Sequence, residues 1–168
     1  MAEAAGKNLY DHDFYAWTQD QAARLRQLTG DNRFDAEHVA EEIADLGKEA
    51  VNKTASNLER CLEHLVKLAV SPATAPIGKW RGEVYRFAGH VRRYFTEAMR
   101  DKIDVEQIWR DAVQAASEDM RDYGETPPTA VGDAPLTLDA ILDRSFDVDD
   151  AVATVRHAIG ADGPNADG

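Results

Sequence analysis

The sequence has little of what marks several common classes of protein. Cys61 is the single cysteine among 168 residues, so no disulfide can form within the chain. Lysine and arginine number 19 against 31 acidic residues, and the formal net charge of -12 argues against general binding to nucleic acid or anionic lipid. No apolar run approaches the ~18–20 residues of a membrane span, and residues 1–8 lack the apolar core of a secretory signal. We therefore expect a cytoplasmic protein with no membrane contact, for which nucleic acid is an unfavoured partner.

The motifs of the common enzyme classes are also missing. The sequence contains no Gly-x-Gly-x-x-Gly, P-loop, Gly-x-Ser-x-Gly or Cys-x-x-Cys pattern, which removes the usual nucleotide-binding, hydrolase and zinc-ribbon interpretations. No segment alternates strictly between apolar and polar residues, so no strand is predicted. With 43% hydrophobic and 30% charged residues, the chain has the composition of a globular protein.

Apolar residues recur instead at steps of three and four, which is the pattern of amphipathic helices. The strongest pattern covers residues 35–70, where the stripe includes Leu46, Leu58, Cys61 and Leu65. Charged residues such as Glu63 take the opposite face, which we expect to be in solvent, and Gly47 is a possible bend because glycine costs ~1 kcal/mol in a helix interior. Further helices are predicted over 11–28, 79–100, 104–123, 136–144 and 149–159.

Short connections between long helices favour antiparallel neighbours. The sequence therefore predicts an all-α fold, an antiparallel up-down four-helix core with one or two short C-terminal helices. A single helical domain should cover residues 9–159, between a flexible N-terminus at 1–8 and a disordered tail at 160–168. Trp17, Trp80 and Trp109 lie on apolar stripes and are expected in the core, as is Cys61.

Several segments resemble a bacterial family known as domain of unknown function twenty-nine. They are YDHDFYAWTQDQAARLRQL, RFDAEHVAEEIADLGKEAVNKTASNLERCLEHLVKL, the Lys79-Trp80-Arg81 triplet and PLTLDAILD, and together they span residues 9–143. The chain departs from the family at Ala69-Val70, where the family has an aromatic residue followed by tyrosine. The resemblance implies an all-α fold and carries no established activity, so it supplies no catalytic residues.

One edge of the long helix 35–70 is a candidate ligand site. His64 lies beside the apolar stripe, and Glu42 and Glu49 lie just beyond the same edge. Glu42 and Glu49 belong to an acidic cluster that also includes Glu37, Glu41 and Asp45. Within it, carboxylates four residues apart can flank a hard cation such as Mg²⁺, and an imidazole can add a nitrogen ligand or move a proton. The other reading is structural: a half-buried His64 bonded to a carboxylate of another helix, beside an acidic face that favours solubility.

The helix 79–100 holds the basic residues of an otherwise acidic chain. A candidate docking face on it comprises Arg81, Arg86, Arg92 and Arg93. These side chains could dock an acidic partner or nucleic acid, or they could pair internally with the acidic helix 35–70.

The sequence identifies no reaction or substrate. It favours a non-enzymatic bacterial module that binds another protein or a second copy of itself, or that regulates a partner as an antitoxin does. The alternative is a metal- or small-molecule-binding bundle that uses Glu42, Glu49 and His64. Apart from a divalent metal in that alternative, no cofactor is predicted.

Overall fold

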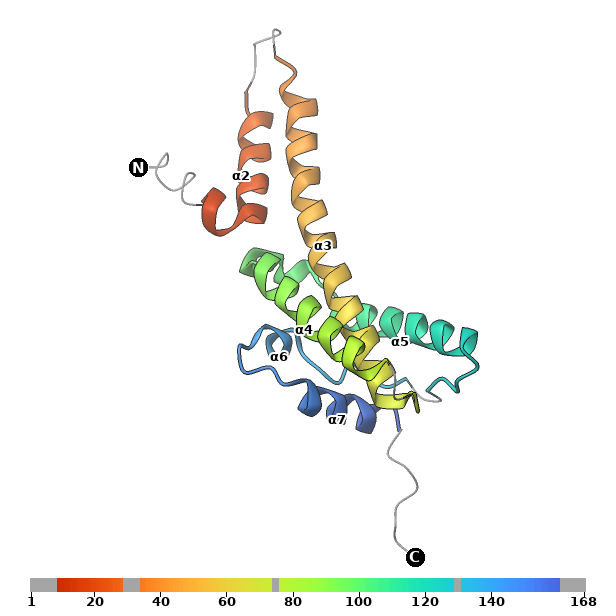
Figure 1. Ribbon diagram of the computed structural model, residues 1–168. Helices are drawn as coiled ribbons and strands as arrows, with labels where there is room; N and C mark the ends of the chain where they lie inside the picture. Colours follow the sequence, from red (N-terminus) through yellow and green to blue (C-terminus); the bar gives the residue numbers. More distant parts are fainter. Residues whose placement is uncertain (1–8, 29–33, 74–75, 129–130, 161–168) are drawn as a thin grey trace, which may run out of the picture. The chain divides into compact units, whose positions relative to one another are not determined.

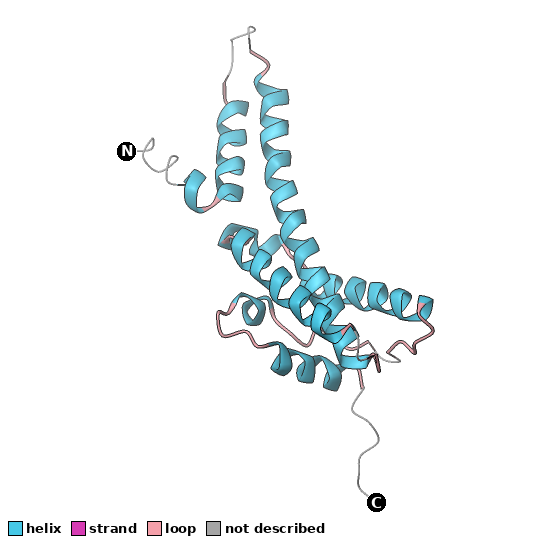
Figure 2. Ribbon diagram, viewed as in Figure 1, coloured by secondary structure: helices cyan, strands magenta, loops and turns pink. Residues whose placement is uncertain are grey.

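The computed structural model describes residues 9–28, 34–73, 76–128 and 131–160, and within these ranges every regular element is a helix (Figures 1 and 2). This confirms the all-α class. Of the ends predicted to be flexible or disordered, residues 1–8 and 161–168 lie outside the described ranges. None of the helices within those ranges combines the length and the apolar composition that a membrane crossing requires.

The contacts within the chain divide it into two compact units. The first comprises the residues up to Thr54 together with Tyr94–Ile103, and the second comprises Ala55–Arg93 and the chain from Asp104 onward. The predicted four-helix core is therefore not confirmed, and the single domain over residues 9–159 stays a prediction.

The first unit contains α2 (Phe14–Arg26), the N-terminal half of α3 (Ala36–Val70) and the short 3₁₀ helix η1 (Glu97–Lys102). Asp13 caps α2, since its carboxylate accepts a hydrogen bond from the Ala16 backbone N–H at 2.9 Å. The same carboxylate oxygen accepts a hydrogen bond from the Thr96 hydroxyl at 2.8 Å. One aspartate thus caps α2 and fixes the segment that leads into η1.

Gly47 lets α2 and α3 approach closely. The glycine is buried, and a Cβ atom built on it would lie 2.2 Å from the Thr18 Oγ1 atom. Thr18 is fully buried, and its hydroxyl donates to the Tyr15 carbonyl at 2.7 Å. Figure 1 shows α2 beside the first half of α3, and α3 continues through Gly47 without interruption. Gly47 is therefore a contact between helices, and the bend considered from the sequence is absent.

The helix predicted over residues 79–100 is shorter than expected, and this is a correction. Helix α4 covers Ile77–Tyr94, and η1 begins at Glu97 as a separate element. Between them Thr96 has an extended backbone with φ -128° and ψ 155°, which an α-helix cannot include. Its hydrogen bond to Asp13 supplies a reason for the break, because a continuing helix would carry that hydroxyl elsewhere.

The second unit contains the C-terminal half of α3, α4, α5 (Val105–Asp122), α6 (Leu138–Leu142) and α7 (Val148–Ala158). Asp104, the first residue of the predicted range, caps α5, and Gly124 follows its end with a φ of +72°. Helix α7 is capped by Asp147, two residues before the predicted start of this helix at residue 149. Side chains with almost no exposure form its core, among them Trp109, Leu58, Leu62, Leu65, Ile141 and Val155.

Of the three tryptophans, Trp109 is completely buried and its indole N–H donates to the Gly132 carbonyl at 3.0 Å. Trp17 and Trp80 are only half-buried, so the prediction that tryptophans lie in the core is confirmed for Trp109 and not for the other two. Cys61 is buried as predicted, and burial raises the pKa of its thiol to about 12. A thiol with that pKa is almost entirely protonated near neutral pH and reacts poorly as a nucleophile.

Candidate functional site

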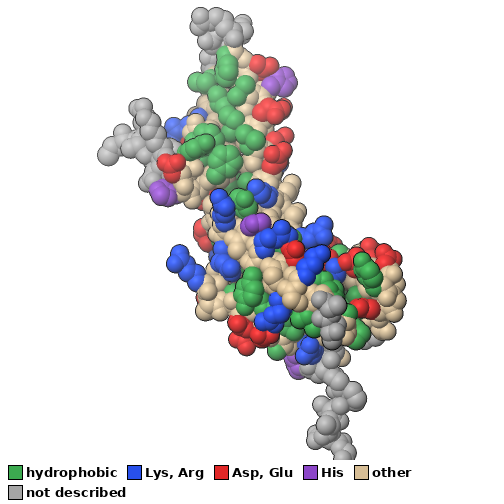
Figure 3. Space-filling view, in the orientation of Figure 1, with side chains coloured by type: hydrophobic (Ala, Val, Ile, Leu, Met, Phe, Trp, Pro, Cys, Tyr) green, Lys and Arg blue, Asp and Glu red, His purple; other side chains and the backbone are tan. Residues whose placement is uncertain are grey.

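The first unit exposes a row of apolar side chains along α2 and α3. We define this apolar strip as Tyr10, Phe14, Trp17 and Leu28 from the α2 side, and Val39, Ile43 and Leu46 from α3. Leu28 is 62% exposed, Tyr10 55% and Leu46 48%, and the other members are half-buried. The strip forms a broad apolar area over the two helices in Figure 3.

An aromatic cluster forms one end of the apolar strip. The Tyr10 ring lies 4.8 Å from Trp17 and 6.0 Å from Phe14, and the Phe14 and Trp17 rings lie 5.7 Å apart. Edge-to-face and stacked contacts of this kind hold large rings in defined positions. The cluster is therefore an ordered surface that keeps part of each ring accessible.

Glu42 and Glu49, two of the predicted ligand residues, flank the strip. On the α3 wheel they follow directly after Leu46, and both are exposed, as is Asp45. Acidic side chains accordingly gather along one margin of the apolar area in Figure 3. Arg26 of α2 and Glu37 of α3 form an exposed ion pair at 3.5 Å.

The structure does not bring Glu42 and Glu49 together with His64. All three lie on α3, which is one unbroken helix. At 1.5 Å per residue, Glu49 and His64 are separated by about 22 Å along the axis, and Glu42 and His64 by about 33 Å. Within the described residues no group of three or more His, Cys, Asp or Glu side chains is placed to hold a metal ion.

His64 belongs to the second unit and has a different partner from the predicted carboxylate. Its Nδ1 atom lies 2.8 Å from the Arg60 carbonyl oxygen, so this nitrogen donates to a backbone group one turn earlier. The ring is half-buried and lies 5.8 Å from the Phe87 ring. This corrects the expectation of a carboxylate from another helix, while confirming the half-buried position.

The arginines of the predicted docking face make contacts inside the second unit. Arg81 forms a bidentate ion pair with Asp149 on α7, and Arg86 pairs with Glu83 on its own helix. Arg92 donates to the Ile141 carbonyl at 2.8 Å, which satisfies the end of α6. Arg93 is exposed on the same helix. The partners of Arg81, Arg86 and Arg92 therefore come from α7, α4 and α6, and not from the acidic α3 that the sequence suggested.

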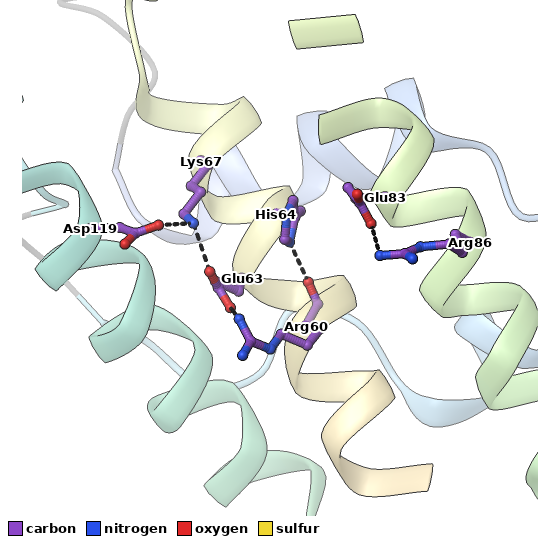
Figure 4. A network of polar contacts seen from close by, with 7 residues as sticks. All are labelled: Arg60, Glu63, His64, Lys67, Glu83, Arg86 and Asp119. Atoms are coloured by element: carbon purple, nitrogen blue, oxygen red, sulfur yellow. Dashed lines mark hydrogen bonds and ion pairs between the residues drawn. The ribbon is translucent and has the colours of Figure 1, made fainter. Parts of the chain in front are cut away.

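A buried ion-pair cluster joins α3 to α5 in the second unit (Figure 4). The Lys67 ammonium donates to the Glu63 carboxylate at 2.6 Å and also to Asp119, and Arg60 lies 3.3 Å from the other oxygen of Glu63. The side chains of Glu63 and Lys67 are only 5% and 7% exposed, whereas Asp119 is 53% exposed. Lys67 lies between the two carboxylates, so its charge is balanced in a place that excludes most water.

The pKa of Lys67 reflects two opposing effects. Burial lowers the pKa by penalising the charged form, but the hydrogen bonds that Lys67 donates to Asp119 and Glu63 raise it, and the net shift is upward. Lys67 is therefore an ammonium under all ordinary conditions. A neutral amine that could attack a carbonyl carbon is not available from this residue.

This cluster forms one side of a pocket of about 620 Å³ in the second unit. Its lining includes Arg60 and His64 from α3, Lys79 and Trp80 from α4, and Asp119, Met120, Tyr123 and Glu125 from α5 and the residues after it. Three basic and three acidic side chains line the pocket, beside the apolar surfaces of Trp80 and Met120. The volume is within the range of small-molecule sites.

Sequence reasoning missed this cluster. It placed Glu63 on the solvated face of its helix, whereas the structure buries Glu63 with Lys67. The four-residue spacing of Glu63 and Lys67 is a signal that could have suggested an ion pair. The contribution of Asp119, 52 residues further along than Lys67, has no counterpart in local sequence.

Comparison with known proteins gives a family and a fold. The family model described as "Domain of unknown function DUF29" matches residues 9–147. A crystal structure of an alpha-helical protein of unknown function from Rhodospirillum rubrum is similar, with a TM-score of 0.78 and 31% sequence identity. The match covers 86% of this chain and 95% of that one. No curated protein matches the chain.

Proposed function

The chain belongs to the DUF29 family of domains of unknown function, and we propose that this member is a non-enzymatic module that binds another protein through the apolar strip of its first unit. The observation that supports the proposal is the exposure of Leu28, Leu46 and Tyr10 on one helix pair, each about half or more in solvent. Scattered apolar residues are ordinary on protein surfaces, but a contiguous row with an ordered aromatic cluster is typical of an interaction site.

The chemistry beside the strip favours one kind of partner. Glu42, Asp45 and Glu49 follow one margin of the strip, so a partner helix would carry apolar residues in its centre and lysine or arginine along one side. A second copy of this chain is less suitable. The chain has a formal net charge of -12, and pairing two identical strips would bring acidic margins near each other. The proposed occupant is therefore a basic amphipathic helix of a different protein.

Regulation of that partner, as an antitoxin regulates a toxin, is one use of such binding and rests on the same surface. Metal binding by Glu42, Glu49 and His64 gains no support from their separation along α3. The small-molecule alternative has support of its own from the pocket in the second unit.

A defined peptide tests the proposed occupant. A synthetic helix of leucine and lysine at amphipathic spacing should bind the full-length protein at low salt, measured by fluorescence anisotropy, and should weaken as salt rises. A peptide with glutamate in place of lysine should not bind. Leu46→Ser should weaken binding about fivefold, because burial of the exposed half of this leucine contributes roughly 1 kcal/mol.

Matched variants separate the strip from general attraction between opposite charges. Ile77→Ser removes an apolar side chain of similar exposure, 40%, from the second unit and should leave binding unchanged. Glu42→Gln should weaken binding more than Glu118→Gln, since both glutamates are exposed but only Glu42 lies beside the strip. Equal effects within either pair would refute the docking surface. Light scattering that detects a dimer abolished by Leu46→Ser would assign the strip to a second copy instead.

A further inference from the structure

We propose that the pocket of the second unit binds a small zwitterion, an α-amino acid with a large apolar side chain. This inference is independent of the protein-binding strip, because it uses different residues in the other unit. It rests on the distribution of charge around the pocket, on the ion pairs that fix its inner side, and on the apolar surfaces between them.

Apart from Glu63 and Lys67, the buried ion pair of α3, the two signs of charge come from different elements. Arg60 and Lys79 reach the pocket from α3 and α4, whereas Asp119 and Glu125 come from α5 and the residues after it. Lys79 is exposed and forms no ion pair with any residue that the structure describes. Asp119 is 53% exposed and uses one carboxylate oxygen to bind Lys67. The pocket therefore offers accessible cations from α3 and α4, and carboxylate oxygens from α5 and the residues after it.

A ligand with a single charge fits this distribution poorly. An anion drawn to Lys79 would also meet the carboxylates of Asp119 and Glu125, and an amine drawn to those carboxylates would also meet Arg60 and Lys79. An α-amino acid carries both charges on adjacent atoms. Its carboxylate can accept from Lys79 while its ammonium donates toward Glu125 or the exposed part of Asp119.

The inner side of the pocket is already ordered by buried ion pairs. Glu63 and Lys67 are almost completely buried, and Lys67 bonds to Asp119 on the neighbouring helix (Figure 4). In Figure 4 the side chains of Lys67 and Asp119 point toward each other from α3 and α5. Asp119 is thus held in place before a ligand arrives, which reduces the ordering cost of binding.

Trp80 and Met120 give the pocket its specificity for an apolar side chain. The half-buried indole of Trp80 and the buried thioether of Met120 both line the pocket. Aromatic and thioether groups contact planar rings well, so tryptophan and phenylalanine are the expected ligands within this class. The volume of about 620 Å³ holds either with bound water.

The experiment uses L-tryptophan with two analogues that each lack one charge. Tryptamine lacks the carboxylate, and indole-3-propionate lacks the ammonium. Calorimetric titration of the full-length protein should detect L-tryptophan, with each analogue binding roughly tenfold or more weakly. In a ¹H–¹⁵N spectrum the indole signal of Trp80 should move on titration, while that of Trp109, buried and bonded to Gly132, should not.

Variants assign each charge to its side of the pocket. Lys79→Gln should weaken L-tryptophan and indole-3-propionate several-fold without affecting tryptamine, and Glu125→Gln should weaken L-tryptophan and tryptamine without affecting indole-3-propionate. Lys102→Gln, an exposed lysine of the first unit, is the matched control and should change nothing. Both pocket variants alter partly or fully exposed side chains, so folding should be retained, and circular dichroism verifies this.

Three results would overturn the proposal. No detectable heat or shift with millimolar L-tryptophan, L-phenylalanine or L-leucine would remove the ligand class. Equal binding of an analogue and L-tryptophan would remove the need for two charges. An unchanged affinity in both pocket variants would place the ligand elsewhere. None of these results bears on the peptide that tests the apolar strip.

Discussion

Replacing Gly47 by alanine should destabilise the protein, although alanine is the better helix former. In an open helix interior, the change from glycine to alanine contributes about 1 kcal/mol of stability. At Gly47 the new methyl group would lie 2.2 Å from the Thr18 Oγ1 atom and 2.9 Å from the Gln19 amide nitrogen. Both distances are well inside van der Waals contact, so α2 must move or Thr18 must rotate.

Both adjustments cost free energy. Thr18 is fully buried, its β-branched side chain is stiff at χ1, and rotation would break the 2.7 Å hydrogen bond to the Tyr15 carbonyl. Overpacking of a tight contact typically costs ~1–3 kcal/mol, and a lost hydrogen bond costs ~1 kcal/mol more. After the propensity gain of about 1 kcal/mol is subtracted, the expected net loss of stability for Gly47→Ala is about 1–3 kcal/mol.

Urea unfolding followed by far-UV circular dichroism measures the effect. Gly82→Ala is the matched control, because a methyl group there meets nothing within 4 Å and should stabilise by about 0.5–1 kcal/mol. In a Thr18→Ala background, the penalty of Gly47→Ala should largely disappear. If Gly47→Ala is as stable as Gly82→Ala, the close approach of α2 and α3 at this glycine is refuted.

Three further predictions concern single side chains. Lys67→Met should cost about 3 kcal/mol, since it leaves the buried Glu63 without its ammonium. Because the pKa of Lys67 is raised in the folded protein, its charged form contributes fully to stability below the ordinary pKa of 10.5, and this contribution is lost as pH rises through the folded value. The free energy of unfolding, measured with urea, should therefore fall over this alkaline range in the native protein. Lys67→Met should lack that fall. Cys61, with a pKa of about 12, should resist iodoacetamide at pH 8 in the native protein and react once unfolded; rapid native labelling would contradict its burial. The pKa of His38, raised chiefly by its hydrogen bond with Asp35 at 2.6 Å, should fall in Asp35→Asn by NMR titration, and no change would refute that pairing.

The sequence predicts the helices well where one local pattern governs them. Helix α3 begins at Ala36 and ends at Val70, one residue from the predicted start and at the predicted end. The stripe of apolar residues and the Ser71-Pro72 stop are both local signals. The caps Asp13 and Asp104 are found for the same reason, because an N-cap bonds to an N–H group three residues away.

Prediction fails where a distant residue decides the outcome. Thr96 ends α4 early through its hydrogen bond to Asp13, 83 residues away in the sequence. The sequence alone predicts a possible bend at Gly47, whereas the structure shows that the glycine makes room for Thr18. Glu63 reads as a solvated charge, but Lys67 and Asp119 allow its burial. In each case the local pattern is read correctly and a tertiary contact overrides it.

The candidate sites show the same difference between local sequence signals and contacts made by distant residues. The sequence singles out Glu42 and Glu49 because they border a helical stripe, and in the structure the apolar residue beside them, Leu46, is exposed. Their grouping with His64 ignored the rise along the helix, which separates them. The pocket could not be predicted from the sequence. Lys79, Asp119 and Glu125 come from segments whose proximity does not follow from any spacing of residues along the chain.

Neither compact unit is an uninterrupted stretch of the chain. The first takes residues from both sides of the 55–93 segment, and α3 supplies its opening half to one unit and its closing half to the other. A single cut at any position therefore divides at least one unit, and a cut between Asp13 and Thr96 would separate the two partners of the hydrogen bond that fixes the segment before η1. Dissection of this protein must therefore proceed by side-chain replacement in the intact polypeptide, and a protease that cut α3 between Thr54 and Ala55 would separate the parts of the helix that belong to the two units.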